Sequence, residues 1–214
     1  MKYFYFGKDA NIIYSLDFIN SIKDATTKDS LRKTVLSFRT SLDKKDIISM
    51  SEDIFNSFLS IEKIQDSSKF MLYVDFRNEV ETKGIISKLL SLGKEVYLPV
   101  TLKDERKLIP KRIFLLDDLV SGAYGILEPS LDAPSINPSF LDVVVVPGSV
   151  FDKSGYRTGY GGGFYDRFLE ETSAIRVGVC FDFQLVDDVF PEKHDKKMDF
   201  IITEKHILFL NQKN

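Results

Sequence analysis

Apolar residues recur at helical spacing through about the first sixty positions of the chain, and the pattern predicts three amphipathic helices. Asp9 is placed to cap the first helix, and Asp43 to cap the third. Thr26 is expected to begin the second, because Asp29 follows three residues later, as in a capping box. The apolar stripes are Ile12, Ile13, Leu16 and Ile19 in the first helix; Leu31, Val35, Phe38 and Leu42 in the second; and Ile47, Ile48, Ile54, Phe55, Phe58 and Leu59 in the third.

Beyond these helices the chain alternates short apolar runs with helical segments, which is typical of an α/β fold. The run at 142–146 ends in four consecutive valines and predicts the central strand of a parallel sheet covered on both faces. Strands at 69–76 and 96–98 flank a helix expected over 81–91 and closed by Gly93, so a right-handed parallel crossover is predicted.

The rest of the chain completes the expected sheet. Residues 101–129 predict a β excursion, and a loop that ends at Gly163 leads into a helix over 164–171. Strands are expected at 176–181 and, last, at 200–203. Because no repeat or long linker divides the chain, residues 1–214 are predicted to form a single three-layer α/β domain with N-terminal helices.

Composition narrows the class of protein. The 29 Lys and Arg against 32 Asp and Glu give a net charge of −3, so neither nucleic acid nor a membrane surface is expected as a partner. Uncharged stretches reach only nine residues, as at 143–151, too short to span a bilayer, and Lys8 interrupts any secretory signal. A lone Cys180 is expected to be a buried thiol, which favours a reducing, cytoplasmic location. No obligate protein partner is evident.

A glycine-rich loop between the central strand and the next helix carries the clearest chemical signal. Glycine there lets backbone N–H groups approach a ligand closely, and the loop lies at the carboxyl end of a parallel strand, so a phosphate site is predicted. The alternative is a tight turn without a ligand. The loop reads Arg157, Thr158, Gly159, Tyr160, Gly161, Gly162, Gly163, Phe164, Tyr165, Asp166 and Arg167.

Charged residues near this loop support the same interpretation. Asp166 would repel phosphates unless a cation such as Mg²⁺ lies between them. The alternative is that this carboxylate, in the first turn of a helix, only complements the helix dipole. Lys28, Arg32 and Arg39 fall on one face of the second predicted helix and predict an anion site, with an ordinary solvated face as the alternative. Arg39 is interpreted as structural.

Glu79 and the pair His194 and Asp195 are the remaining candidates. Glu79 follows a predicted strand, so its carboxylate can project into a cleft, although a solvated loop is the commoner situation. Two histidines and one cysteine do not support a zinc site, and no arrangement of Ser, His and Asp suggests a hydrolase. His194 is interpreted as structural and His206 as peripheral.

Taken in order, these motifs resemble the 5-formyltetrahydrofolate cyclo-ligase family, also called methenyltetrahydrofolate synthetases. The resemblance runs from about Lys28 to His206, and residues 1–27 exceed the family's usual start. It rests on Lys28-x-x-Leu31-Arg32, Glu79-x-x-Thr82, Pro147-Gly148-x-x-Phe151-Asp152, the loop from Arg157 to Asp166, and His194-Asp195.

The resemblance implies a Rossmann-like sheet of the sugar-phosphate isomerase and CoA-transferase type. It also implies an enzyme that closes the ring of 5-formyltetrahydrofolate to give 5,10-methenyltetrahydrofolate, in a reaction that consumes ATP and requires Mg²⁺. The substrate can carry a polyglutamate tail or lack one. Lys28, Arg32 and the loop of 157–165 would hold ATP. Asp166 and Asp195 would hold Mg²⁺.

For the folate, the resemblance implies that Glu79 binds the pterin and that Val74 and Phe164 line its pocket. Arg157, Tyr165 and Asp166 would be catalytic. Two positions depart from the family pattern: Gly162 stands where some members have Lys, so a cation must come from Arg157 or Lys28, and Phe164 stands where others have a tyrosine.

Two other classes of function remain open. One is a phosphometabolite-binding protein or isomerase on a related fold that uses no ATP. In that case the two aspartates and the pair Lys28 and Arg32 would lack a purpose. The other is a structural or interaction protein, for which the glycine loop would have no ligand.

Overall fold

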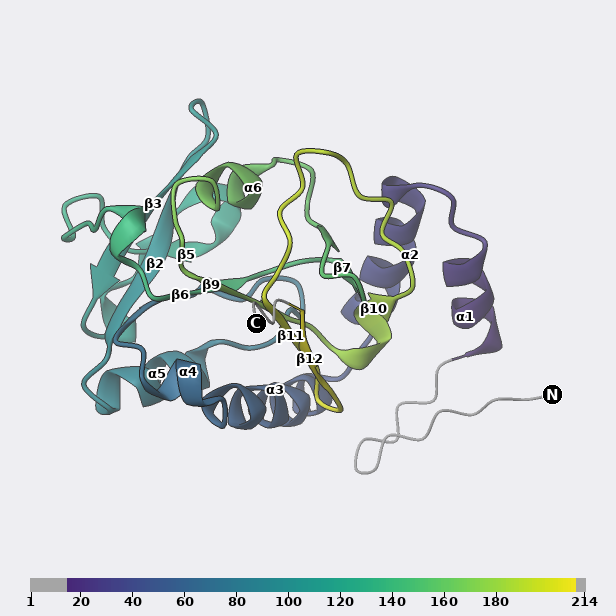
Figure 1. The fold of residues 1–214 in the computed structure, drawn as a ribbon, viewed down its shortest axis with the longest axis horizontal. Helices are drawn as coiled ribbons and strands as arrows, with labels where there is room; N and C mark the ends of the chain where they lie inside the picture. The colour runs from purple at the N-terminus through teal and green to yellow at the C-terminus, as the bar shows by residue number, and fades with distance from the viewer. Residues whose placement is uncertain (1–14, 211–214) are drawn as a thin grey trace.

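A seven-stranded sheet forms the centre of the computed structural model, which describes residues 15–210 (Figure 1). Its strand order is β12-β11-β9-β6-β1-β2-β3; β1, β2, β6, β9 and β11 run parallel, and β3 and β12 are antiparallel edges. The strands span Lys69–Met71 (β1), Glu95–Leu102 (β2), Lys107–Ile113 (β3), Val143–Val146 (β6), Ile175–Val179 (β9), Phe200–Ile202 (β11) and Ile207–Phe209 (β12).

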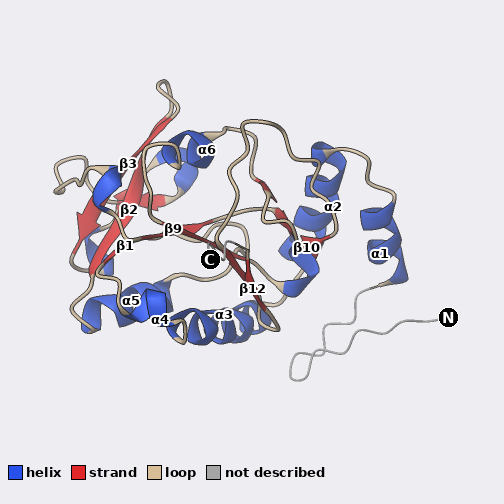
Figure 2. Cartoon of the chain, viewed as in Figure 1, coloured by secondary structure: helices blue, strands red, loops and turns tan. Residues whose placement is uncertain are grey.

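Helices cover both faces of this sheet (Figures 1 and 2). Helices α3, α4 and α5 lie along one face and α6 on the other, which confirms the predicted α/β class with a mostly parallel sheet flanked by helices. The helices span Leu16–Lys23 (α1), Lys28–Thr40 (α2), Lys44–Leu59 (α3), Glu62–Gln65 (α4), Lys83–Ser91 (α5) and Phe164–Phe168 (α6), with single 3₁₀ turns at Leu116–Asp118, Ala123–Gly125, Pro138–Phe140 and Asp182–Gln184.

The four consecutive valines of β6 occupy the middle of the sheet, as predicted, and all are fully buried. Val143 and Val145 belong to the core that α2 to α5 cover, whereas Val144 and Val146 belong to the core on the α6 side. This alternation follows from the two-residue period of a strand. Within residues 15–210, no helix combines the length and apolar character needed to cross a membrane.

The starts of the N-terminal helices differ from the prediction. Helix α1 begins at Leu16, where the Ser15 hydroxyl accepts from the Phe18 N–H, while the predicted cap Asp9 lies outside the described residues. Helix α2 is capped by Thr27, one position later than predicted, because Thr27 and Ser30 exchange hydrogen bonds between side chain and backbone.

Further corrections concern the remaining helices. Asp43 does precede α3, but its side chain makes no capping bond. Helix α5 begins at Lys83 and ends before Gly93, the predicted stop, which has a left-handed conformation with a φ of 73°. Helix α6 stops at Phe168 instead of Glu171, because the N–H groups of Glu170 and Glu171 donate only three residues back and tighten the turn.

Three predicted strands have different ends. β1 stops at Met71 because residues 73–82 form a loop instead of continuing the strand. The loop is closed by a hydrogen bond from Thr82 Oγ1 to the Tyr73 carbonyl, at 2.7 Å. β2 runs through Pro99 to Leu102, because β3 pairs with it over 96–102 and sets Pro99 opposite Pro110, while β1 pairs only with 95–97. β11 is not the last strand, because β12 folds back against it.

The predicted β excursion and the parallel pairing of the strands on either side of α5, β1 and β2, are confirmed, but the loop after β6 is more ordered than expected. It contains β7 (Val150–Asp152) and β8 (Arg157–Thr158), which join β10 (Leu185–Val186) in a small second sheet. The excursion also includes a hairpin of β4 (Val120–Ser121) and β5 (Leu127–Glu128). Cys180 is a buried free thiol, as expected.

Candidate active site

A cavity of about 860 Å³ lies beyond the carboxyl ends of β1 and β6, where parallel sheets commonly bind ligands. Its volume falls at the upper end of the usual range for ligand sites, roughly 300–1,000 Å³. All the candidate binding and metal residues chosen from the sequence line it: Lys28, Arg32, Val74, Glu79, Arg157, Thr158, Gly159, Tyr160, Gly161, Gly162, Gly163, Phe164, Tyr165, Asp166 and Asp195.

The glycine loop forms one wall of this cavity, between β8 and α6. Gly161 and Gly163 have φ values of 92° and 63°, a conformation that side-chain-bearing residues rarely adopt. Arg167 Nη1 donates to the carbonyls of Gly162 and Gly163, at 2.9 and 2.8 Å. Arg32 Nη1 donates to the Gly159 carbonyl at 3.3 Å and so connects α2 to the loop. The carbonyls are thus turned toward arginines at the rim.

The two departures from the family pattern lie against each other. A Cβ atom built on Gly162 would come within 2.6 Å of the Phe164 ring. A side chain at position 162 would therefore require this ring to move. The small residue and the phenyl ring fit together here, so the loop cannot take a lysine at position 162 without changing the wall beside it.

Arg157 and Tyr165 leave two polar atoms without protein partners. Arg157 is buried, and its Nη2 lies 3.2 Å from Asp166 Oδ1, while its guanidinium faces the Tyr165 ring at 6.0 Å. Among the described residues, Arg157 Nε and the Tyr165 hydroxyl have no hydrogen-bond partner. Burial also raises the pKa of Tyr165 far above its usual value, so the phenol keeps its proton. These two buried donors beside the cavity are therefore available to a ligand.

Lys28 joins the start of α2 to the loop that carries Asp195. Its Nζ lies 2.6 Å from Asp195 Oδ2 and 3.1 Å from Glu192 Oε1. Partial burial works against the charged amine, but these hydrogen bonds raise the pKa of Lys28. For Asp195, burial is likewise outweighed by the Glu192 N–H and by Lys28, and the pKa falls. Both groups are charged at neutral pH.

The two predicted metal ligands meet at this side of the cavity. The backbone N–H of Lys196, next to Asp195, donates to Asp166 Oδ1 at 3.3 Å. No cluster of three or more potential metal ligands occurs among residues 15–210. Mg²⁺ needs fewer, because it commonly uses one or two carboxylates with phosphate oxygens and water. Asp166 Oδ2 accepts no hydrogen bond from the described residues, and Asp195 Oδ1 has only the exposed His194 Nε2 nearby, at 3.8 Å, so the pair fits Mg²⁺ bound together with phosphates.

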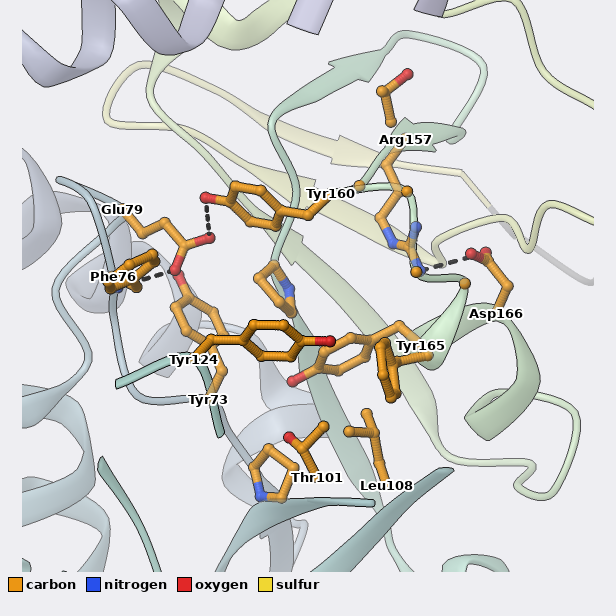
Figure 3. A pocket seen from close by; sticks show the side chains of 18 of the residues that line it. Tyr73, Phe76, Glu79, Thr101, Leu108, Tyr124, Arg157, Tyr160, Tyr165 and Asp166 are labelled. Atoms are coloured by element: carbon orange, nitrogen blue, oxygen red, sulfur yellow. Dashed lines mark hydrogen bonds and ion pairs between the residues drawn. The ribbon is translucent and has the colours of Figure 1, made fainter. Parts of the chain in front are cut away.

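Glu79 lies at the opposite side, in a tight loop where Arg77 and Asn78 have φ values of 49° and 57°. Its side chain is buried. Oε2 accepts from the Phe76 N–H at 3.0 Å and Oε1 from the Tyr160 hydroxyl at 2.9 Å. Burial raises the pKa of Glu79, and nearby Arg39 opposes that shift. Figure 3 shows Glu79 at one side of the cavity, Arg157 and Asp166 at the other, and tyrosines between them.

Two residues at or near the cavity were not predicted as part of the site from the sequence. Tyr124, from the β4–β5 hairpin, lines the cavity with a φ of 58°, and Lys103 Nζ lies 4.4 Å from its ring centre. Arg39, interpreted as structural, is fully buried and donates to the Tyr160 hydroxyl that holds Glu79. The spacing of Arg39 after Arg32 was a usable signal; nothing in the sequence distinguishes Tyr124 from other loop aromatics. His194 lies exposed at the rim.

Comparison with known proteins assigns this chain to a family. Residues 24–204 match the model of the 5-formyltetrahydrofolate cyclo-ligase family. The chain belongs to this family. A 5-formyltetrahydrofolate cyclo-ligase of Saccharomyces cerevisiae is 33% identical over 82% of this chain and 94% of the yeast protein. A Haemophilus influenzae protein of the same name is 30% identical over 78% of this chain and 91% of its own length.

Solved structures agree with this assignment. The 5,10-methenyltetrahydrofolate synthetase of Aquifex aeolicus superposes with a TM-score of 0.78 and 32% identity, over 87% of this chain and 94% of that one. A synthetase from Mycoplasma pneumoniae, at 22% identity and a TM-score of 0.67, supports the fold, over 83% of this chain and 98% of its own. The chain is therefore an enzyme of the cyclo-ligase family, a ligase of folate metabolism.

Proposed function

We propose that this chain closes 5-formyltetrahydrofolate to 5,10-methenyltetrahydrofolate and converts ATP to ADP and phosphate as it does so. One observation carries the proposal: a single cavity joins a buried carboxylate, Glu79, to a glycine loop with cations, in a member of the cyclo-ligase family. We call these two parts the pterin end, around Glu79 and Tyr160, and the phosphate end, around Lys28, Arg157 and Asp166.

At the pterin end, Glu79 accepts hydrogen bonds from the N–H donors on the pyrimidine edge of the folate. Its two oxygens already hold one protein donor each, and each has a further lone pair for a ligand. A charged acceptor makes such bonds shorter and stronger than a neutral one. Val74 and Phe164 line the cavity beside it and supply apolar contact for the ring.

At the phosphate end, backbone N–H groups of the loop from Thr158 to Gly163 and the cations Lys28, Arg32 and Arg157 bind the phosphates of ATP. The unpartnered Nε–H of Arg157 supports this assignment, because a phosphate oxygen would satisfy it. These cations pair with carboxylates in the structure, so phosphate binding would exchange one set of anions for another.

Asp166 and Asp195 are the residues that would hold Mg²⁺. When bound, Mg²⁺ neutralises negative charge on the phosphates beside these carboxylates. With these carboxylates on a metal, Lys28 would be free to bind a phosphate, and the Arg157 guanidinium would be free to face the transferred group.

The chemistry must overcome the low reactivity of an amide. The formyl oxygen attacks the γ-phosphorus, ADP leaves, and the formyl carbon becomes an imidate-like electrophile. N10 then attacks this carbon and gives up its proton, and phosphate leaves with the former formyl oxygen as the ring closes. For such a transfer the protein mainly positions groups and stabilises charge. Arg157 and the Tyr165 hydroxyl provide donors where the two substrates meet.

The contributing residues, from Lys28 to Asp195, come from one continuous α/β unit around one sheet. This supports a single catalytic domain. Tyr124 lines the cavity and is exposed, so the tail of the folate, with or without further glutamates, can leave the cavity along this side chain.

Absorbance tests the proposal directly. Methenyltetrahydrofolate absorbs in the near ultraviolet where 5-formyltetrahydrofolate does not, so the full mixture of enzyme, folate, ATP and Mg²⁺ should give a rising signal. Omission of either ATP or Mg²⁺ should abolish the rise. A rise that needs no ATP, or no folate turnover at all, would contradict the proposal and favour a phosphometabolite-binding role on the same fold.

A further inference from the structure

Arg39 is a buried cation without a directly paired carboxylate. It lies in α2, and its side chain is fully buried. Nε donates to the Arg77 carbonyl at 3.1 Å, Nη1 to the Gly148 carbonyl at 3.4 Å and Nη2 to the Tyr160 hydroxyl at 2.5 Å. Among the described residues, no carboxylate lies within 4 Å of its guanidinium. Because a buried charge is costly unless it is compensated, a counter-charge must be near.

The counter-charge is Glu79, one hydroxyl group away. A guanidinium can only donate, so the Tyr160 oxygen must accept from Arg39, and its single proton must point to Glu79 Oε1 at 2.9 Å. The direction of both hydrogen bonds is therefore fixed. The Phe76 N–H holds the other oxygen of Glu79, so the carboxylate is fixed from two sides.

We propose that Arg39 is a positioning residue for folate binding: through the Tyr160 hydroxyl it holds the Glu79 carboxylate in the orientation that accepts from a pterin. This inference rests on the proposed function, because the pterin is the ligand that Glu79 is proposed to bind. It assigns the third cation of the α2 face, after Lys28 and Arg32, to the pterin end instead of the phosphate end.

The charges around Glu79 favour this role for Arg39. Asp75 comes from the same loop, Tyr73 from the segment after β1, and Tyr160 and Tyr165 from the glycine loop and α6. Burial and Asp75 raise the pKa of Glu79, whereas Arg39 and the two hydrogen bonds lower it. Arg157 lies beyond the Tyr165 ring, and Arg39 is the cation that lowers the pKa of Glu79, so the carboxylate should protonate at a higher pH without it.

A double-mutant cycle separates this role from simple structural support. The variants are Tyr160→Phe, which removes the hydroxyl and keeps the ring, Arg39→Met, and the two combined. We expect calorimetry to give folate dissociation constants raised about tenfold for each single variant, as for lost bonds to charged groups. The double variant should be within about threefold of Arg39→Met, because both changes break one chain of contacts.

Two further measurements distinguish this role from a general loss of structure. The affinity for a non-hydrolysable ATP analogue should change by less than about twofold in all variants, since the Tyr160 hydroxyl faces Glu79. The acidic limb of kcat/KM for the folate should move to higher pH in Arg39→Met and return toward wild type in Arg39→Lys. A merely structural Arg39 would lower the melting temperature and weaken both ligands without moving the limb.

The possible failures can be told apart. If wild type binds no 5-formyltetrahydrofolate, the proposed function is wrong. If wild type binds it but the two single effects simply multiply in the double variant, or the acidic limb does not move, the role of Arg39 is wrong and the function stands. Should Arg39→Met not fold, an unchanged folate affinity in Tyr160→Phe would overturn the inference.

Discussion

The two ends of the cavity compensate charge in different ways. At the phosphate end, cations and carboxylates touch directly: Lys28 lies 2.6 Å from Asp195, and Arg157 lies 3.2 Å from Asp166. At the pterin end, opposite charges are separated by a tyrosine hydroxyl, and no direct ion pair forms. The first arrangement can exchange partners when a charged ligand arrives. The second holds one carboxylate in place.

Exposure separates the Lys28 ion pair from the other charges of the cavity. Lys28 keeps 23% of its side-chain surface exposed, so its ion pair is partly screened by water and inexpensive to break, whereas Arg157 at the same end is buried and depends on Asp166 as its partner. Arg39 and Glu79 are buried, where an unpaired charge is strongly unfavourable. We therefore expect changes at the phosphate end to alter ATP use and changes at the pterin end to alter folate binding, with little crossover.

The largest effect is expected from Asp166→Asn. Loss of a proposed metal ligand removes charge stabilisation of several kcal/mol, so kcat should fall about a hundredfold or more. Stopped assays across a Mg²⁺ titration measure this. Asp187→Asn is the control, because Asp187 is 93% exposed and pairs only with Lys153 among the described residues. Near-normal turnover in folded Asp166→Asn would remove Asp166 from the metal site.

Glu79→Gln tests the pterin end. The variant keeps the side-chain length but replaces one acceptor with a donor, so folate binding should weaken by about 1–3 kcal/mol, the range for hydrogen bonds to charged groups. Calorimetry with 5-formyltetrahydrofolate and, separately, an ATP analogue measures both affinities. Glu81→Gln, two residues along and paired with Lys44, provides the matched control. Unchanged folate affinity in Glu79→Gln would refute the pterin role.

Lys28→Ala and Arg32→Ala should raise the KM for ATP by about tenfold each, and the KM for folate far less, because these cations bind phosphate. Lys33→Ala is the control, since Lys33 lies on the same helix with 78% of its side chain exposed. Initial rates with each substrate varied in turn give the constants. Equal effects on both substrates, or none on either, would show that this face of α2 is only a solvated surface.

The smallest effect is expected from pH. Because burial raises the pKa of Glu79 above its usual 4.5, the group gains a proton at a higher pH than an ordinary glutamate and then accepts hydrogen bonds less well. Folate affinity should therefore be complete above the raised pKa and fall as pH decreases through it, while affinity for the ATP analogue stays nearly level. Glu79→Gln should lack this step. The same step in both proteins would mean that another group titrates.

The sequence predicts the phosphate end better than the pterin end, and the reason is physical. The glycine loop and the cations of α2 carry local signals: consecutive glycines that favour positive φ, and charges at helical spacing. The central valines of β6 are equally local, because burial on both faces requires an uninterrupted apolar run.

The contacts that organise the pterin end are not local. Arg39 meets Tyr160 across 121 positions of sequence, and Tyr160 meets Glu79 across 81. The small sheet of β7, β8 and β10 likewise depends on pairing between distant, very short strands. Such contacts are set by tertiary packing, so a single sequence gives no periodicity from which to predict them.

Transfer of an oxygen isotope tests most directly the claim that the two ends bring folate and ATP together. Substrate labelled with ¹⁸O in the formyl group should be converted in the presence of ATP and Mg²⁺, and the released phosphate examined by mass spectrometry. If the formyl oxygen attacks the γ-phosphorus, each phosphate formed carries one ¹⁸O atom. Unlabelled phosphate, with the label lost to water, would contradict direct phosphorylation of the folate in this cavity.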